Sequence, residues 1–457
     1  MFKQTILVAV VLTLLLCEPP RFTRVAAAEV KAAAAQGPLA DYVAKEDKSY
    51  KWTKRREGKL GSGDYVELTL TSQTWKDVVW KHQLFIYKPA KIAIEKQALF
   101  WIDGGRWNDD LEKPAAADAD LGTRTRLLAS LADQLQTPVA LLLHVPQQPM
   151  FDGMVEDEII SLTFAKYFLT GDAEWPLLLP MVKSAVRGMD AVQEFTRQEW
   201  QLDINSFTMT GASKRGWTTW LTSAIDPRVA ALAPMVIDML NMTPQMKHQL
   251  ESFGGYSEQI ADYTSKGLQN FLDTERGQQL AGIVDPFSYR AHLSQPKLII
   301  LATNDRYWPL DALNLYWNQL DGEKYVLYVP NNGHGIRDIP RLVGALNAFH
   351  QHVANGNKLP KLEWKFTEED AKLRLRVKSD VAPKQVQIWT ANSDTRDFRN
   401  SQFAAKPMQA DGPDYVYELA VPDSGYAALL GEAVFNGQRI PFNLSTNVRI
   451  VGHGKKK

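Results

Sequence analysis

The sequence is poor in cysteine, and its single one, Cys17, lies close to the N-terminus. A lone cysteine excludes a disulfide within the chain, so a protein of 457 residues, 45% of them hydrophobic, must rely on its core for stability. Net charge is absent too, because 52 basic residues balance 52 acidic ones. This balance gives no indication of a nucleic-acid partner. Nothing in the sequence implies a metal or an organic cofactor.

A membrane-spanning run is also missing at the N-terminus. The apolar run at 6–17 is too short to span a bilayer comfortably, follows Lys3 and precedes a stretch of alanines. This order predicts a secretory signal peptide at 1–28, cleaved after Ala28. We therefore expect a secreted or periplasmic protein with no membrane span in the mature chain. The residue before Cys17 is not small, which disfavours lipidation there.

Beyond the leader, the hydrophobic pattern divides the chain. Residues 29–40 are alanine-rich and are expected to be flexible. Strands and helices alternate over 41–360, which predicts an α/β domain with a mostly parallel sheet and helices on both faces. A polar, helical stretch at 239–292 resembles an insertion. The segment 361–457 contains only short alternating strands, which predicts a β-sandwich of immunoglobulin-like type.

The expected elements of the α/β domain follow from local periodicity. Strands are expected at 65–75, 80–87, 98–103, 138–146, 206–210, 229–237, 297–303 and 325–329. Helices are expected at 121–136, 175–200, 214–225, 310–320 and 336–353.

A sharp turn between one strand and the next helix carries the first candidate for chemistry. Phe207 and Met209 alternate with threonines, Gly211 breaks the strand, and a helix begins after Ser213. Such a turn exposes the serine hydroxyl, as in a nucleophile elbow. The match is imperfect, because the glycine expected two places after the serine is found at Gly216, three places after. The alternative interpretation is a serine that caps an ordinary helix.

A serine hydroxyl needs a base, and the base needs an acid to orient it. Two later strands end in loops that contain Asp305 and His334, in the order serine, acid, histidine that α/β-hydrolases use. We therefore predict Ser213 as the nucleophile, His334 as the general base and acid, and Asp305 as the orienting acid. Asp311 and Asp338 are the alternative acids.

An acyl-transfer site also needs two backbone donors for the oxyanion. The N–H of Lys214 is one candidate, and the glycine turn that contains Gly105 and Arg106 is the other. The alternative is that this glycine pair only forms a tight turn.

Further residues near the predicted strand ends are candidates for substrate binding. The acids Glu156, Asp157 and Glu158 could bind a free amine of a substrate, or they could favour the first turn of a helix. Aromatic residues flank the predicted site loops and could line a substrate site or pack in the core: Trp107, Tyr307 and Trp308.

The motifs around the three predicted catalytic residues resemble those of the PhoPQ-activated pathogenicity-related family, whose eukaryotic relatives include autocrine proliferation repressor proteins. The segments that carry the resemblance are Gly211–Trp220, Asn304–Asp311, Asn331–His334, Trp101–Gly105, Glu156–Glu158 and Pro176–Phe195. The resemblance spans roughly residues 40–450. It implies an α/β-hydrolase domain with a serine triad and a β-rich C-terminal domain, but it implies no particular substrate.

Two classes of function are compatible with these residues. The first is an exported serine hydrolase that acts on an ester or peptide substrate through an acyl-enzyme. The second is a non-catalytic secreted binding protein on a hydrolase scaffold. Lys214, directly after the serine, also resembles the basic residue of glucuronoyl esterases, so a carbohydrate ester is a further candidate substrate.

Overall fold

The computed structural model describes residues 35–115 and 120–454. The predicted signal peptide and Cys17 lie outside these residues. In the described part of the chain, no helix is both long and apolar enough to cross a bilayer.

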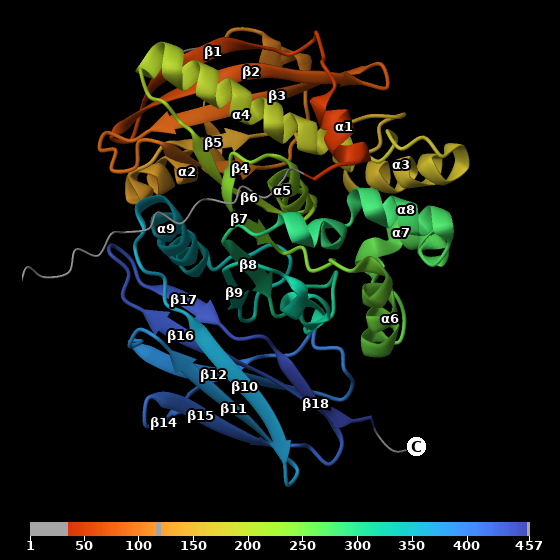
Figure 1. Cartoon of the computed structure of the whole chain (residues 1–457), viewed down its shortest axis with the longest axis vertical. Helices are drawn as coiled ribbons and strands as arrows, with labels where there is room; N and C mark the ends of the chain where they lie inside the picture. Colours follow the sequence, from red (N-terminus) through yellow and green to blue (C-terminus); the bar gives the residue numbers. More distant parts are fainter. Residues whose placement is uncertain (1–34, 116–119, 455–457) are drawn as a thin grey trace, which may run out of the picture. The chain divides into compact units, whose positions relative to one another are not determined.

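A nine-stranded sheet forms the framework of the first domain (Figure 1). Its strand order is β1-β2-β3-β5-β4-β6-β7-β8-β9, antiparallel from β1 to β5 and parallel from β5 to β9. The strands are β1 (Lys51–Leu60), β2 (Gly63–Trp75), β3 (Val78–Lys88), β4 (Gln97–Ile102), β5 (Val139–Leu142), β6 (Ser206–Ala212), β7 (Val229–Met235), β8 (Lys297–Ala302) and β9 (Lys324–Val329). The predicted α/β class with a mostly parallel sheet is confirmed.

Helices cover both faces of this sheet because its central strands are apolar on both sides. Along β4, Phe100 and Ile102 join the core beneath α4 and α5, whereas Leu99 joins a second cluster with α2. The helices that pack on the sheet are α2 (Gly122–Leu135), α4 (Leu178–Trp200), α5 (Lys214–Ile225) and α9 (Ile339–Asn355). Because the strands from β5 to β9 in this sheet run parallel, their carboxyl ends all lie at the same edge.

The segment 239–292 is helical, as the sequence predicts. It contains α6 (Met242–Phe253), η2 (Glu258–Ile260), α7 (Ala261–Thr264), η3 (Leu268–Phe271), α8 (Glu275–Val284) and η4 (Pro286–His292). Of these, α7, α8 and η3 pack beside α3 (Glu156–Thr170), and Figure 1 shows α7 and α8 next to it.

The helix predicted at 310–320 is replaced by two 3-10 turns, η5 (Ala312–Leu315) and η6 (Trp317–Gln319). The Gln245 amide donates to the Ala312 carbonyl oxygen, which an α-helix would use internally. The N–H of Tyr316, the helical partner of Ala312, donates to the Leu313 carbonyl oxygen instead. Tertiary hydrogen bonds thus override the local helical pattern.

The N-terminal end of the described chain also differs from the expectation. The sequence predicts a flexible segment at 29–40, whereas α1 (Pro38–Ala44) begins within it. Leu39 is fully buried, and the buried ammonium of Lys183 on α4 donates to the carbonyl oxygen of Lys45 at 2.7 Å. This packing against α4 orders a stretch that its alanine-rich composition alone would leave unstructured.

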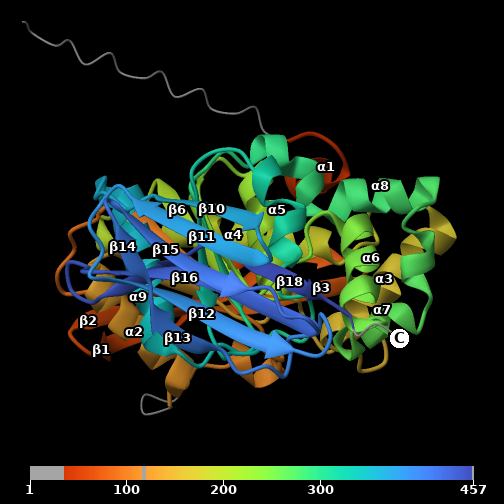
Figure 2. The same cartoon turned by 90° about the horizontal axis from the view of Figure 1, so that it is seen from below.

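The C-terminal domain consists of two antiparallel sheets (Figure 2). One has the order β10-β11-β15-β14, and the other has the order β13-β12-β16-β17 with β18 also paired to β16. The strands are β10 (Leu362–Glu369), β11 (Lys372–Ser379), β12 (Gln385–Ser393), β13 (Ala404–Pro407), β14 (Gln409–Asp411), β15 (Asp414–Ala420), β16 (Gly425–Phe435), β17 (Phe442–Ser445) and β18 (Arg449–His453). The immunoglobulin-like topology stays a prediction.

The core of these sheets is continuous with the core of the first domain. Leu375 and Leu429 of the C-terminal sheets belong to the same buried cluster as Ile300 of β8 and Phe349 of α9. A buried carboxylate, Glu432, lies at this junction.

Glu432 on β16 is fully buried and accepts hydrogen bonds from both sides of the junction. The Arg341 Nε on α9 donates to it at 2.9 Å, and the Trp389 Nε1 on β12 at 2.6 Å. A buried charge is tolerated only when it is paired and hydrogen-bonded. Glu432 meets both conditions.

We expect Glu432→Ala to lower the free energy of unfolding by about 3–5 kcal/mol, because Arg341 would lose its buried partner. The midpoint of urea unfolding, followed by tryptophan fluorescence, measures the change. Glu418→Ala is the matched control, since Glu418 pairs with Arg374 on the surface of the same domain. An equally small shift for both variants would contradict a structural role for the junction.

Candidate functional site

Ser213 is the single residue between β6 and α5, and its backbone conformation is strained. Its φ and ψ are 57° and −129°, in a region that residues other than glycine rarely adopt. The backbone holds it there: its N–H donates to the Met235 carbonyl oxygen at 2.9 Å, and its carbonyl accepts from Trp217 at 2.9 Å. This is the geometry of a nucleophile elbow.

The two glycines near the elbow are explained by close packing of β6 against α5. A Cβ on Gly211 would lie 2.7 Å from the Arg215 carbonyl oxygen. A Cβ on Gly216 would lie 2.8 Å from a methyl of Ile237 and 2.9 Å from the Gly211 carbonyl oxygen. A glycine is needed three places after Ser213, not two, because Gly216 is the helix residue that faces Gly211.

His334 and Asp305 come from loops after β9 and β8 and contact each other. The His334 Nδ1 lies 2.9 Å from Oδ2 and 3.1 Å from Oδ1 of Asp305. The backbone N–H of Tyr307 donates to Asp305 at 2.9 Å, and the Tyr307 ring stacks on the imidazole with centroids 4.2 Å apart. The Asp305 bond and the Tyr307 ring together set the orientation of the imidazole.

The other ring nitrogen of His334, Nε2, is buried and has no hydrogen-bond partner among the described residues. His334 and Ser213 line the same pocket. No hydrogen bond joins Nε2 to the Ser213 hydroxyl, so Nε2 is open to a group that enters the pocket.

The two alternative acids have other partners. Asp311 accepts from the His248 Nε2 at 2.7 Å and pairs with Arg396 at 2.7 Å. Asp338 caps α9 by accepting from the backbone N–H of Arg341. The structure thus brings Asp305, not Asp311 or Asp338, to His334.

The two loops that carry Asp305 and His334 are tied to each other and to the C-terminal domain. The N–H of Asn304 donates to the Asn332 carbonyl oxygen at 2.9 Å. The side-chain amide of Asn304 donates to the carbonyl oxygen of Ser401 at 2.7 Å. The C-terminal domain therefore helps to hold the acid-bearing loop in place.

Four charged side chains form a cluster directly behind the elbow, which we call the elbow ion-pair cluster: Lys214, Arg215, Glu156 and Asp157. Arg215 forms a bidentate pair with Glu156 at 2.7 and 2.8 Å. The Lys214 ammonium lies 2.7 Å from Glu156 and 3.2 Å from Asp157. Two buried cations thus balance two carboxylates, and the Glu156 side chain is 37% exposed. This pairing was not foreseen in the sequence, where the basic and acidic residues are far apart.

The electrostatics of Glu156 reflect this pairing. Burial alone would raise the pKa of Glu156, but the hydrogen bonds and charge of Arg215, followed by those of Lys214, outweigh it. The pKa of Glu156 is held well below its usual range, so the carboxylate is ionised at neutral pH.

The elbow ion-pair cluster also reaches the glycine turn after β4. Gln148 donates from its side-chain amide to Glu156 at 2.7 Å and to the Gly105 carbonyl oxygen at 2.8 Å. The Arg215 guanidinium packs against Gly104, where a Cβ would collide with it. The turn with Gly105 and Arg106 is therefore held against the elbow. Its N–H groups remain candidates, with that of Lys214, for the oxyanion hole.

The predicted substrate-binding residues separate into two groups. Asp157, Tyr307 and Trp308 line the pocket beside Ser213. Trp107, by contrast, packs edge-on against His144, with ring centroids 5.7 Å apart, and Glu158 lies half-buried in the first turn of α3.

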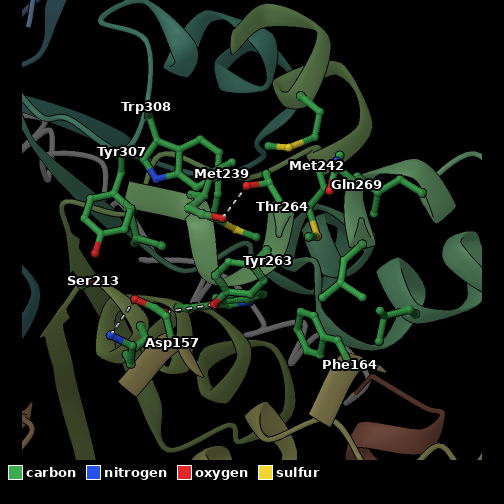
Figure 3. Close-up of a pocket in the computed structure, with 18 of the residues that line it drawn as sticks. Asp157, Phe164, Ser213, Met239, Met242, Tyr263, Thr264, Gln269, Tyr307 and Trp308 are labelled. Atoms are coloured by element: carbon green, nitrogen blue, oxygen red, sulfur yellow. Dashed lines mark hydrogen bonds and ion pairs between the residues drawn. The ribbon is translucent and has the colours of Figure 1, made fainter. Parts of the chain in front are cut away.

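Most of the pocket wall comes from the segment 239–292 and was not predicted from the sequence (Figure 3). Ser213 and Asp157 lie at one side of the pocket in this view, and Gln269 lies at the other. The wall residues from this segment are Met239, Met242, Met246, Ile260, Tyr263, Thr264, Leu268, Gln269, Leu272 and Leu280. Their spacing within short helices is the only sequence signal, and the polar residues around them obscure it.

Within residues 35–115 and 120–454, no three His, Cys, Asp or Glu side chains are grouped so that they could hold a metal ion.

Two solved structures show weak similarity to this chain. Acetyl xylan esterase 1 from Thermoanaerobacterium sp. JW/SL YS485 is 12% identical, with a TM-score of 0.45 over 69% of this chain and 92% of that one. A glucuronoyl esterase from Solibacter usitatus is 14% identical, with a TM-score of 0.35 over 59% and 74% of the two chains.

Comparison of sequences finds a relative of higher identity and a matching family model. Autocrine proliferation repressor protein A of Dictyostelium discoideum is 32% identical over 435 residues, which cover 87% of this chain and 86% of the relative. The family model of the PhoPQ-activated pathogenicity-related protein matches residues 39–399. The match includes the elbow and both site loops, and the chain belongs to the PhoPQ-activated pathogenicity-related protein family.

Proposed function

We propose that the protein is a serine hydrolase that cleaves an ester or peptide bond through an acyl-enzyme on Ser213. The observation that carries this proposal is His334: Asp305 holds its Nδ1, and its Nε2 is buried without a partner in the pocket that Ser213 lines. A buried polar nitrogen left unpaired carries a free-energy cost, which a catalytic role would explain.

In the proposed reaction, the Ser213 oxygen attacks the carbonyl carbon while its proton moves to His334 Nε2. The oxyanion accepts hydrogen bonds from the N–H of Lys214 and from the turn that contains Gly105 and Arg106. The bond to the leaving group then breaks, and the leaving group takes the proton from Nε2. Water attacks the acyl-enzyme in the same way, and Ser213 regains its proton.

The places of the three residues in the sheet support an α/β-hydrolase assignment as part of this proposal. The serine, the acid and the histidine follow β6, β8 and β9, at the carboxyl ends of parallel strands. We also propose that the protein is exported, because the sequence at 1–28 has the order of charged, apolar and small residues of a signal peptide.

A second candidate function is a secreted signalling protein that needs no catalysis. The 32% identical relative is named as a proliferation repressor, which favours it. The two candidates differ in one observable property, the reactivity of Ser213. A carbohydrate ester remains a third possible substrate type, suggested by the basic residue after the serine.

A fluorophosphonate probe should label the mature protein, and Ser213→Ala should abolish both labelling and ester hydrolysis. Ser206→Ala, at the other end of the same strand, is the matched control and should label normally. In-gel fluorescence and mass spectrometry identify the labelled residue. A folded protein that never labels would favour the signalling function.

Asp305→Asn should lower turnover of an ester substrate by about 10⁴-fold, because the amide would favour the wrong tautomer of His334. Asp311→Asn should have a much smaller effect, since Asp311 contacts His248 instead. Steady-state kinetics of both folded variants test the assignment. Near-normal turnover of Asp305→Asn would exclude it.

Glu156→Gln separates two roles for the acids at 156–158. If Glu156 positions the elbow through Lys214 and Arg215, kcat should fall to a similar degree for a dipeptidyl amide, its N-acetylated form and p-nitrophenyl acetate. If Glu156 binds a substrate amine, KM should rise sharply for the free-amine substrate alone. We expect the first result, because Lys214 and Arg215 already occupy the carboxylate. Glu158→Gln is the control from the same turn.

A further inference from the structure

The pocket beside Ser213 is almost entirely apolar. Two layers build it: α3 and α5 contribute Phe164 and Trp217 on one side, and the segment 239–292 covers the other side. Figure 3 shows Phe164, Tyr263 and Met239 around the same hollow, with Ser213 at its margin. Three methionines line it, Met239, Met242 and Met246. Their flexible thioethers allow the wall to adapt to chains of different shape.

The charged groups that line this pocket are all paired within the protein. Lys214 contacts Glu156 and Asp157, as described above. Asp157 also accepts from the Tyr263 hydroxyl at 3.0 Å. A charged substrate group would have to break one of these pairs or enter without a partner, and both options are costly in a desolvated site.

Two further polar atoms of the wall belong to neutral side chains. The Trp308 Nε1 and the Gln269 Oε1 are buried without partners among the described residues. One is a donor and the other an acceptor, so neither could balance a net charge on a ligand. The wall therefore favours an uncharged occupant.

We propose that this pocket binds an apolar, uncharged acyl portion of the substrate. The inference rests on the proposed function and adds the substrate class to it. Ser213 is itself part of the pocket wall, and an acyl group attached to its oxygen stays in contact with that wall until water releases it. The scissile bond is thus an ester or amide of an apolar acid, and short charged or sugar-like acyl groups are poor substrates.

The test is a series of p-nitrophenyl esters: acetate, butyrate, hexanoate, octanoate and the charged hemisuccinate. We expect kcat/KM to rise about fourfold for each added methylene until the pocket is filled. The hemisuccinate should react more slowly than the butyrate. A flat or falling dependence on chain length would overturn the inference while leaving the serine hydrolase intact.

Met246 on α6 lines the pocket, so the larger side chain of Met246→Trp should reduce the volume of the pocket. The variant should lower the ratio of kcat/KM for octanoate to that for acetate by about tenfold or more. Leu250→Trp is the matched control, since Leu250 lies one turn further along α6 and the residue is 44% exposed. That variant should keep the wild-type ratio, and an equal fall in both variants would contradict the assigned pocket.

A binding experiment separates this inference from the catalytic proposal. Octanamide, which is uncharged, should quench or shift the tryptophan fluorescence of Ser213→Ala, because Trp217 and Trp308 line the pocket. The same titration with Ser213→Ala/Met246→Trp should give at least about tenfold weaker binding. Binding without hydrolysis in the wild type would sink the catalytic proposal alone. Hydrolysis without octanamide binding would sink the apolar pocket alone.

Discussion

The elbow ion-pair cluster is the interaction on which the site depends. Lys214 and Arg215 follow the serine directly, so their ammonium and guanidinium groups lie at the point where strand, turn and helix meet. Pairing with Glu156 and Asp157 attaches α3 to this point, and Gln148 extends the contact to the glycine turn. Removing one partner would leave a buried charge uncompensated, which is costly. The cluster therefore couples the position of the serine to that of the predicted oxyanion donors.

The C-terminal domain takes part in the same arrangement from the opposite side. Its Ser401 accepts from Asn304 in the acid-bearing loop, and its Arg396 pairs with Asp311. Its Arg399 pairs with Glu258 of the segment 239–292 at 2.8 Å. These contacts give the two antiparallel sheets a physical role in fixing the loop that carries Asp305 and the wall that covers the pocket.

Much of the fold could be predicted because local patterns and tertiary packing agree there. The apolar runs of β8 and β9 are buried on both faces, and the pattern of Gly211 and Ser213 indicated a turn that the backbone confirms. The predicted secondary structure was wrong or incomplete where contacts with distant residues determine the local conformation. No strand was predicted at 51–60, a highly charged stretch, yet β1 forms there by pairing with β2. The segment 310–320 has a helical pattern, yet tertiary hydrogen bonds divide it.

The sequence by itself determined the order of strands and helices, the elbow at Ser213 and the loops that carry Asp305 and His334. These features follow from periodicity, glycine placement and chain order, which are local properties. Only the tertiary structure decided which acid meets the histidine, that Glu156 pairs with the residues after the serine, and that the segment 239–292 forms an apolar wall. Each of these depends on groups brought together from distant parts of the chain, where burial and charge pairing, not local pattern, fix the outcome.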